Sequence, residues 1–225
     1  MSEILNLLKL EFICIRKKVL IPILSGIIIY VLIGFFIGPE FLASFILFSG
    51  LFPYAIFGIA AKNNFNNLYG MLPIKRSSII YARFILSALS IGITSAIVIP
   101  VSYAAYLTGR YNDEMAGLFG LSIINLGTVY FVIACIFTAI QYSMIFIFGI
   151  EREVLVTIMS VVIFILLIAL SPFGLTDMLD WVIVKMGALK DSTPLWFYII
   201  AYAFGLLVMG LSAVITALIL RKREL

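Results

Sequence analysis

The sequence predicts an all-α membrane protein with six transmembrane helices in a single domain, residues 1–225. Two observations carry this prediction. Of the 225 residues, 64% are hydrophobic and only 12% are charged, whereas soluble domains have roughly 45–50% apolar and about 25% charged residues. The uncharged residues also form stretches long enough to cross the roughly 30 Å hydrocarbon core of a bilayer as helices. These features exclude a soluble enzyme, a nucleic-acid-binding protein and a secreted disulfide scaffold.

Uncharged stretches define the expected spans. They are rich in Leu, Ile, Phe, Ala and Gly, and they lack the alternating pattern of membrane barrel strands. We therefore expect six helices, at about residues 19–38, 41–61, 79–107, 117–148, 154–173 and 195–220.

Basic residues orient the expected spans. Six crossings place both termini, the 62–83 loop and the 149–153 turn on the same side, which then holds twelve Lys and Arg residues against three on the other side. Short cytoplasmic loops carry an excess of Lys and Arg. Both termini are therefore expected in the cytoplasm, and the chain is expected to be a multi-pass protein of the cell membrane.

The segment before the first span, residues 2–18, has the pattern of an amphipathic helix on the cytoplasmic surface. At 100° per residue its apolar side chains gather on one side. Two interpretations stay open: a simple surface anchor, or an elbow helix that also contacts a cytoplasmic partner. The apolar side comprises Ile4, Leu5, Leu8, Phe12 and Ile15.

The loop after the second span contains a second short amphipathic helix. Phe65, Leu68, Tyr69 and Leu72 follow one another at i, i+3, i+4 and i+7, which is the spacing of one helix face. Pro73 disfavours helical geometry at the residue before it and so ends the helix. A loop that only reversed the chain would need a few residues. The longer, basic loop is typical of a docking element for a cytoplasmic protein.

The residues at the end of this loop carry a family resemblance. Leu72-Pro73-Ile74-Lys75-Arg76-Ser77 resembles the LPIKR signature of small type-2 permeases, the membrane subunits of bacterial ATP-binding-cassette exporters. In that family the signature leads from a coupling helix into the third span, which is its position here. The six spans, the cytoplasmic termini and the N-terminal amphipathic helix also fit the family's topology.

The resemblance implies a coupling helix that sits in a cleft of a separate ATPase subunit. Lys75 and Arg76 would lie at the lipid headgroups or pair with acidic residues of the ATPase, although both could equally serve only to orient the spans. The coupling residues implied are Phe65, Asn66, Asn67, Leu68, Tyr69, Leu72 and Pro73.

The partners follow from the same resemblance. The chain has no G-x-x-x-x-G-K-[ST] phosphate loop, so we expect ATP and Mg²⁺ to bind in the partner ATPase and this chain to be a non-catalytic subunit without a cofactor. A second permease copy or a paralogue would complete a dimer. The chain has no histidine, and Cys14 and Cys135 have no metal-ligand spacing, so no metal site is expected. The remaining partner is the lipid bilayer, and no nucleic acid is expected.

A segment before the last span, residues 175–193, is expected to form one or two short helices at the outer leaflet. Its apolar residues recur at helical spacing, and Trp181 suits the membrane interface. The sequence leaves open whether it is a passive lid or an external gate. The gate residues would be Leu179, Trp181 and Val182.

Polar residues inside the spans are few and uncharged. Carriers coupled to protons or ions usually place acids or bases at mid-membrane, so their absence argues against a secondary transporter. The polar groups either bond neighbouring helices or line a pathway, and glycines at 92, 127, 205 and 210 predict close helix packing. The polar candidates are Asn125, Thr128, Thr138, Gln141, Tyr198 and Tyr202.

These features predict the permease subunit of an ATP-driven exporter. Its apolar interior suits an amphipathic or hydrophobic cargo, such as a peptide toxin, a bacteriocin, an antibiotic or a lipid. The alternative is a membrane immunity or scaffold protein that binds partners and transports nothing.

Overall fold

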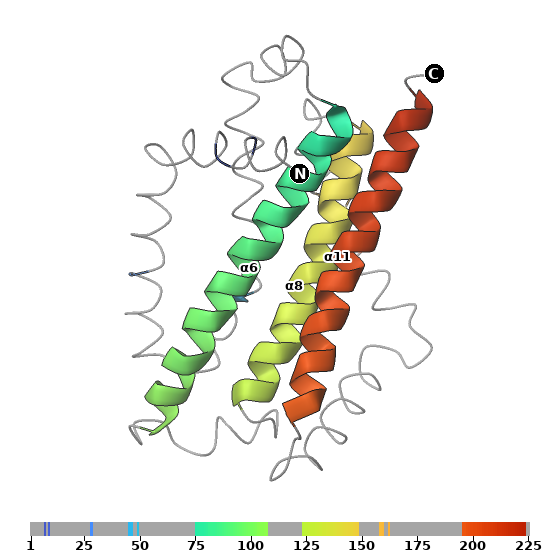
Figure 1. Ribbon diagram of the computed structural model, residues 1–225. Coiled ribbons are helices and arrows are strands. Elements are labelled where there is room, and N and C mark those ends of the chain that lie inside the picture. The colour runs from blue at the N-terminus through green and yellow to red at the C-terminus, as the bar shows by residue number, and fades with distance from the viewer. Residues whose placement is uncertain are drawn as a thin grey trace.

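The computed structural model describes residues 75–107, 123–148 and 195–223, together with Leu7, Lys9, Ile28, Phe45, Ile46, Ser49, Ile158, Met159 and Val162. The continuous parts are three long helices, α6 (Arg76–Leu107), α8 (Ile123–Phe148) and α11 (Leu195–Arg223), which lie side by side (Figure 1). The N-terminal helix, the predicted coupling helix and the external segment lie outside the described residues, apart from Leu7 and Lys9. So do the first, second and fifth expected spans, apart from a few single residues.

Each of the three helices is long and apolar enough to cross a membrane. The membrane-crossing stretches are Ser77–Ala104, Gly127–Phe148 and Leu195–Arg221, and they coincide with the expected spans at 79–107, 117–148 and 195–220. The fit differs at two ends: α6 begins at Arg76, three residues before the expected start, and residues 117–122 lie outside the described part. The helical membrane character predicted from the composition is confirmed for these three segments.

The α6 helix begins at the end of the predicted coupling segment. The backbone N–H of Ser78 donates a hydrogen bond to the carbonyl oxygen of Lys75, at 2.9 Å, which closes the first turn immediately after Pro73. Pro100 lies inside the helix and removes one backbone donor. The helix nevertheless continues to Leu107, so α6 is one rod of 32 residues attached to the coupling segment.

The contacts between the helices show their directions. Phe84 contacts Tyr142, and a Cβ added at Gly127 would meet Ile99, so the numbers rise along α6 as they fall along α8. By contrast, Tyr198 contacts Asn125 and Ser212 contacts Ser143, so α8 and α11 are parallel. These directions are those expected of a third, fourth and sixth span.

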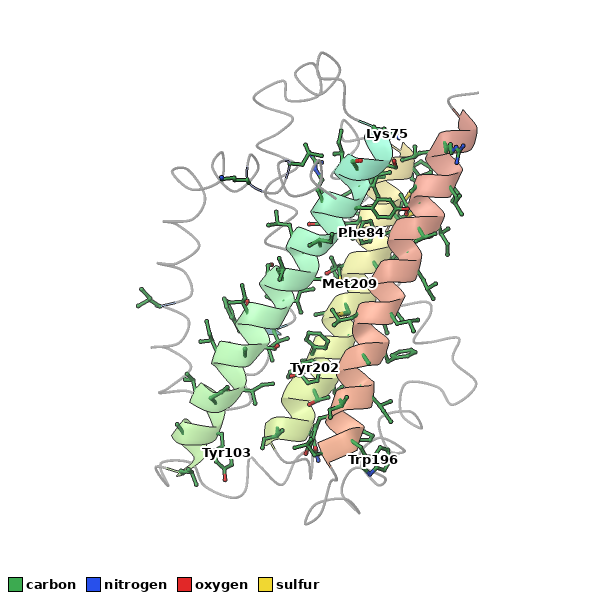
Figure 2. All side chains as sticks on the ribbon, viewed as in Figure 1. Lys75, Phe84, Tyr103, Trp196, Tyr202 and Met209 are labelled. Atoms are coloured by element: carbon green, nitrogen blue, oxygen red, sulfur yellow. The ribbon has the colours of Figure 1, made fainter. Side chains whose placement is uncertain are left out.

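The start of α6 therefore lies at the same end as the last residues of α8 and α11 (Figure 1). Lys75 is at this end, whereas Tyr103 and Trp196 are at the opposite one (Figure 2). Arg221, near the last residue of α11, belongs to the Lys75 end. Basic residues gather on the cytoplasmic side and tryptophan favours membrane interfaces, so the Lys75 end is the one expected in the cytoplasm.

All three helices contact one another, and α8 has the most extensive contacts with its neighbours. Each helix contributes to a single buried cluster, while much of the α11 surface is exposed to the surroundings. Lipid tails are as apolar as these side chains, so helices in a membrane are held by close packing and hydrogen bonds more than by the hydrophobic effect. The centre of the cluster comprises Phe84, Ile91, Val98, Phe131, Cys135, Tyr142, Ile145 and Met209.

Two glycines mark close approaches of α8 to its neighbours. A Cβ added at Gly127 would lie 2.7 Å from Cγ1 of Ile99 on α6, and one added at Gly205 would lie 3.0 Å from Cε1 of Phe131 on α8. The predicted close packing is confirmed at these positions. The prediction is wrong for Gly92 and Gly210, because no atom of the described residues lies within 4 Å of a Cβ built there.

Candidate functional site

A chain of hydroxyl groups joins α8 to α11 near the expected cytoplasmic end. Ser212 donates a hydrogen bond to the carbonyl oxygen of Ala139, at 3.1 Å, and its oxygen lies 2.7 Å from that of Ser143. Because a serine has a single hydroxyl hydrogen, Ser143 is the donor in the second contact. Thr216 in turn donates to Ser143, at 2.9 Å. Every hydroxyl in this chain therefore donates one hydrogen bond.

A second polar contact joins the same two helices near their other end. The Tyr198 hydroxyl donates to Oδ1 of Asn125 at 2.7 Å, and Asn125 is fully buried. Between this contact and the hydroxyl chain, the ring of Tyr202 packs on that of Phe131, with centroids 4.2 Å apart. The Tyr202 hydroxyl interacts with the hydroxyls of Ser95 on α6 and Thr128 on α8. It is thus the point at which the three helices meet through polar groups. The hydroxyls of Ser95 and Thr128 each donate to a carbonyl of their own helix, so Tyr202 can donate its single hydrogen to only one of them at a time.

The α6–α8 contact is mainly aromatic at the expected cytoplasmic end. Phe84 meets Tyr142 edge to face, with ring centroids 5.5 Å apart, and stacks on Phe146 at 6.5 Å. The guanidinium carbon of Arg83 lies 5.9 Å from the centroid of Phe146, within the range of a cation–π interaction. The side chain of Arg83 is buried. From the sequence, Arg83 was counted among the basic residues of the cytoplasmic side and was also included in the expected span at 79–107, but the burial of its side chain against Phe146 was not predicted.

The predicted polar residues occupy different surroundings. Tyr198 donates a hydrogen bond to Asn125, whereas Thr128 donates to the carbonyl oxygen of Ile124 in its own helix. Thr138 is also fully buried and has an interaction partner. Gln141 differs: it is fully buried, yet neither its Nε2 nor its Oε1 atom has a hydrogen-bond partner.

Further unpaired hydroxyls lie on α6. They belong to Ser87, Ser90 and Ser102, whose oxygens are buried without a hydrogen-bond partner. Ser87 and Ser90 were not among the polar candidates named from the sequence, since a serine in an apolar span can bond a carbonyl of its own helix and the sequence does not show which serines do so. Thr94 and Ser95 on the same helix do so, to the carbonyls of Ser90 and Gly92.

The predicted docking residues lie just before the described part of the chain. Lys75 immediately precedes α6 and is exposed, and Arg76 is the first residue of the helix. The other coupling residues, at positions 65–73, lie outside the described residues, as do the gate residues at 179, 181 and 182. Within the described ranges, no group of three or more Cys, Asp or Glu residues could hold a metal ion.

Comparison with known protein families gives a match over nearly the whole chain. The model of a family described as ABC-2 family transporter protein matches residues 6–221. No curated protein sequence and no solved structure matches the chain significantly.

Proposed function

Since the chain belongs to the ABC-2 family of transporter proteins, we propose that it is the membrane subunit of an ATP-driven exporter for an amphipathic or hydrophobic cargo. Family membership makes it a permease subunit of an ABC transporter, with an ABC ATPase as its partner. The further steps of the proposal are the contact with that ATPase, the direction of transport and the chemistry of the cargo.

The position of α6 supports a coupling role for residues 63–72. The helix begins within a few residues of this segment, with its first turn closed on Lys75. An α-helix is a stiff rod, rising 1.5 Å per residue, so a displacement at its start is carried along its length. When ATP brings two ATPase subunits together, the 63–72 helices move with them and α6 follows. Two permeases, either identical or paralogous, would form the dimer.

The surroundings of α8 support an apolar or uncharged cargo. The polar side chains buried along the three helices are hydroxyls and amides, apart from Arg83 near the expected cytoplasmic end. A charged cargo group would lose its hydration among such residues without a compensating ion pair. Peptides, antibiotics and lipids with large apolar surfaces would lose less.

The proposal is tested by binding of the partner ABC ATPase. Leu68→Asp and Tyr69→Asp each place a charge on the apolar face of the predicted coupling helix. We expect either change to abolish retention of the ATPase by the tagged permease in a pull-down, and to abolish ATP-dependent export in cells. Asn63→Asp is the matched control, because it adds the same charge on the opposite face and aspartate caps a helix as well as asparagine does.

The same experiment separates the exporter from a scaffold or immunity protein. A scaffold that transports nothing would protect or bind its partner without any ATPase. If Leu68→Asp and Tyr69→Asp both retained the ATPase and its transport-coupled activity, the docking assignment would be wrong.

A further inference from the structure

Gln141 faces away from α11. Successive residues of a helix differ by about 100°. Tyr142 packs against Phe84 of α6, and Ser143, the next residue, bonds Ser212 of α11. Ser143 is therefore about 100° from Tyr142 in the direction of α11. Gln141, the residue before Tyr142, is about 100° from it in the other direction. Its side chain lies on the side of the α6–α8 pair that is opposite α11.

Ser87 and Ser90 lie on the same side. Along α6 they follow Phe84 at i+3 and i+6. Ser95 interacts with Tyr202 of α11 and so marks the side of α6 that faces α11. Ser87 and Ser90 are rotated away from that side. The antiparallel contact of Phe84 with Tyr142 places Ser87 about level with Ala139. It is then within two residues of Gln141 along the axis, roughly 3 Å, and Ser90 is one turn further. We call Ser87, Ser90 and Gln141 the polar seam.

The polar seam is covered by protein and not by lipid. Gln141 and Ser87 are both completely buried. Gly127 lies about 40° around α8 from Gln141, and a Cβ added there would be 3.7 Å from Cδ1 of Ile46, a residue of the expected second span. The seam therefore lies inside the chain.

The unpaired atoms distinguish this seam from the other side of α8. All four side-chain oxygens and nitrogens of the seam, at Ser87, Ser90 and Gln141, are buried without a hydrogen bond. On the α11 side, Asn125, Ser143, Ser212 and Thr216 are bonded across the helices. An unpaired buried amide is destabilising, so a state in which these atoms gained hydrogen-bond partners would recover that free energy.

We propose that Ser87, Ser90 and Gln141 line the cargo route, and that they contact a cargo with uncharged hydrogen-bonding groups, such as peptide amides, when α6 separates from α8. The inference rests on the proposed function and adds to it a route and a cargo class. The primary amide of Gln141 has both a donor and an acceptor, which complement the C=O and N–H of a peptide group. The hydroxyls of Ser87 and Ser90 can each donate or accept a hydrogen bond.

The movable partner in this opening is α6. It follows the coupling segment directly, whereas α8 and α11 are tied to each other by hydrogen bonds near both ends. Phe84 contacts Tyr142 and Phe146 through aromatic rings, and such contacts are less directional than hydrogen bonds. The polar contacts of α6 that would be exchanged include that of Arg83 with Phe146 and that of Ser95 with Tyr202.

The test is the reactivity of single cysteines in membrane vesicles that hold the permease with its ATPase. Cys14→Ser and Cys135→Ala remove the native thiols, and Ser87→Cys, Gln141→Cys and the control Ser143→Cys are made in that background. We expect ATP and Mg²⁺ to change the rate of modification by a charged methanethiosulfonate at least tenfold at positions 87 and 141. Position 143, in the bonded α8–α11 contact, should stay unreactive.

Two results would overturn the route. One is a rate at both seam positions that does not respond to nucleotide, and the other is an equal response at position 143. Ser87→Cys changes a single atom, so it tests the seam even if Gln141→Cys does not fold. Retention of the ATPase in the pull-down, together with unresponsive thiols, would contradict the seam alone and leave the proposed function standing.

The cargo class is tested by protection of the same thiols. The probes are a 20-residue amphipathic peptide of Leu, Ala and Ser with blocked ends, and a fatty acid of similar apolar length. We expect the peptide to slow modification at position 141 at least fivefold and the fatty acid to have no effect. Protection by the fatty acid alone, or by neither probe, would contradict recognition of peptide amides.

Discussion

The two faces that α8 presents to its neighbours are built differently. Toward α11 its polar residues are bonded across the helices, from Asn125 at one end to Ser143 near the other. Toward α6 the contact consists mostly of rings and aliphatic groups, and the unpaired atoms of Ser87 and Gln141 lie beside it. In lipid, apolar contact alone gives little preference for one neighbouring helix over another. We therefore expect the hydrogen bonds to hold α8 and α11 together, and α6 to be the helix that can move relative to α8.

The comparison also bears on the proposed coupling to an ATPase. The α8–α11 pair is parallel and bonded, so it serves as a fixed body. The α6 helix, attached to the predicted coupling segment, runs antiparallel to it and meets it through side chains that can exchange neighbours. In the proposed mechanism, movement that begins at Lys75 would change the contacts of α6 with α8 and α11.

The largest effect is expected where α6 and α8 approach most closely. Gly127→Leu would force its side chain into Ile99, because even a Cβ at this position lies 2.7 Å from Cγ1 of that residue. Overpacking of this kind destabilises by about 3 kcal/mol. We expect a fall of several degrees in the thermal unfolding midpoint of the purified protein in detergent.

Gly210→Leu is the matched control for this change. A Cβ at Gly210 meets no atom of the described residues within 4 Å, so the same substitution should leave the midpoint unchanged or raise it. Equal loss at both positions would show that leucine disturbs the helices for a reason other than the α6–α8 approach.

A smaller effect of opposite sign is expected at Gln141. Gln141→Leu removes two buried atoms that have no hydrogen-bond partner and keeps a similar volume, so we expect a gain of about 2 kcal/mol in the free energy of unfolding. Asn125→Leu should instead lower it, since it leaves the Tyr198 hydroxyl without its partner. Thermal unfolding of the two variants side by side measures the difference.

Gln141→Leu should also impair export, because it removes the polar contact that the route offers. A stabilised protein with reduced export would agree with a seam that opens. If Gln141→Leu lowered stability as much as Asn125→Leu does, the two faces of α8 would not differ in the way proposed.

The smallest change in the free energy of unfolding is expected when Ser212, which is hydrogen-bonded, and Ser87, which is not, are each replaced by alanine. Ser212→Ala removes one hydrogen bond to Ala139 and one from Ser143, and hydrogen bonds between membrane helices contribute about 0.6 kcal/mol on average, with a maximum of about 1.7. We expect a loss of about 1 kcal/mol. Ser87→Ala breaks no hydrogen bond and should cause no loss.

Denaturant titration in mixed micelles is the measurement for this pair of variants. The contrast between them matters more than either value alone. A loss at Ser87→Ala equal to that at Ser212→Ala would mean that the Ser87 hydroxyl is bonded in solution.

The sequence was a good guide to the helices and a poor one to their contacts. The positions of α6, α8 and α11 could be predicted because uncharged stretches of this length form helices in a bilayer wherever they occur. Close packing was predicted for four glycines, yet the structure confirms it at Gly127 and Gly205 only. A glycine in the sequence does not show whether a neighbouring helix faces it.

The polar residues illustrate the same limit. Asn125, Gln141 and Tyr202 were equal candidates for helix contacts or a pathway, since each is an uncharged polar residue in an apolar stretch. Arg83 lay at the cytoplasmic start of the expected span at 79–107, and the sequence did not show that its side chain is buried against Phe146. Such assignments depend on which residue of another helix lies opposite, at separations of 60 or more positions along the chain.

The sequence by itself determined that this chain belongs in a membrane, where its helices run and which end of them is basic, because these properties follow from hydropathy, length and charge along a single segment. The tertiary structure decided which polar groups are bonded and which are left unpaired, because a hydrogen bond requires two groups within about 3 Å. Only the arrangement of α6, α8 and α11 in space sets that distance. It separates Gln141, with two unpaired atoms, from Asn125, which is bonded to Tyr198 on the adjacent helix.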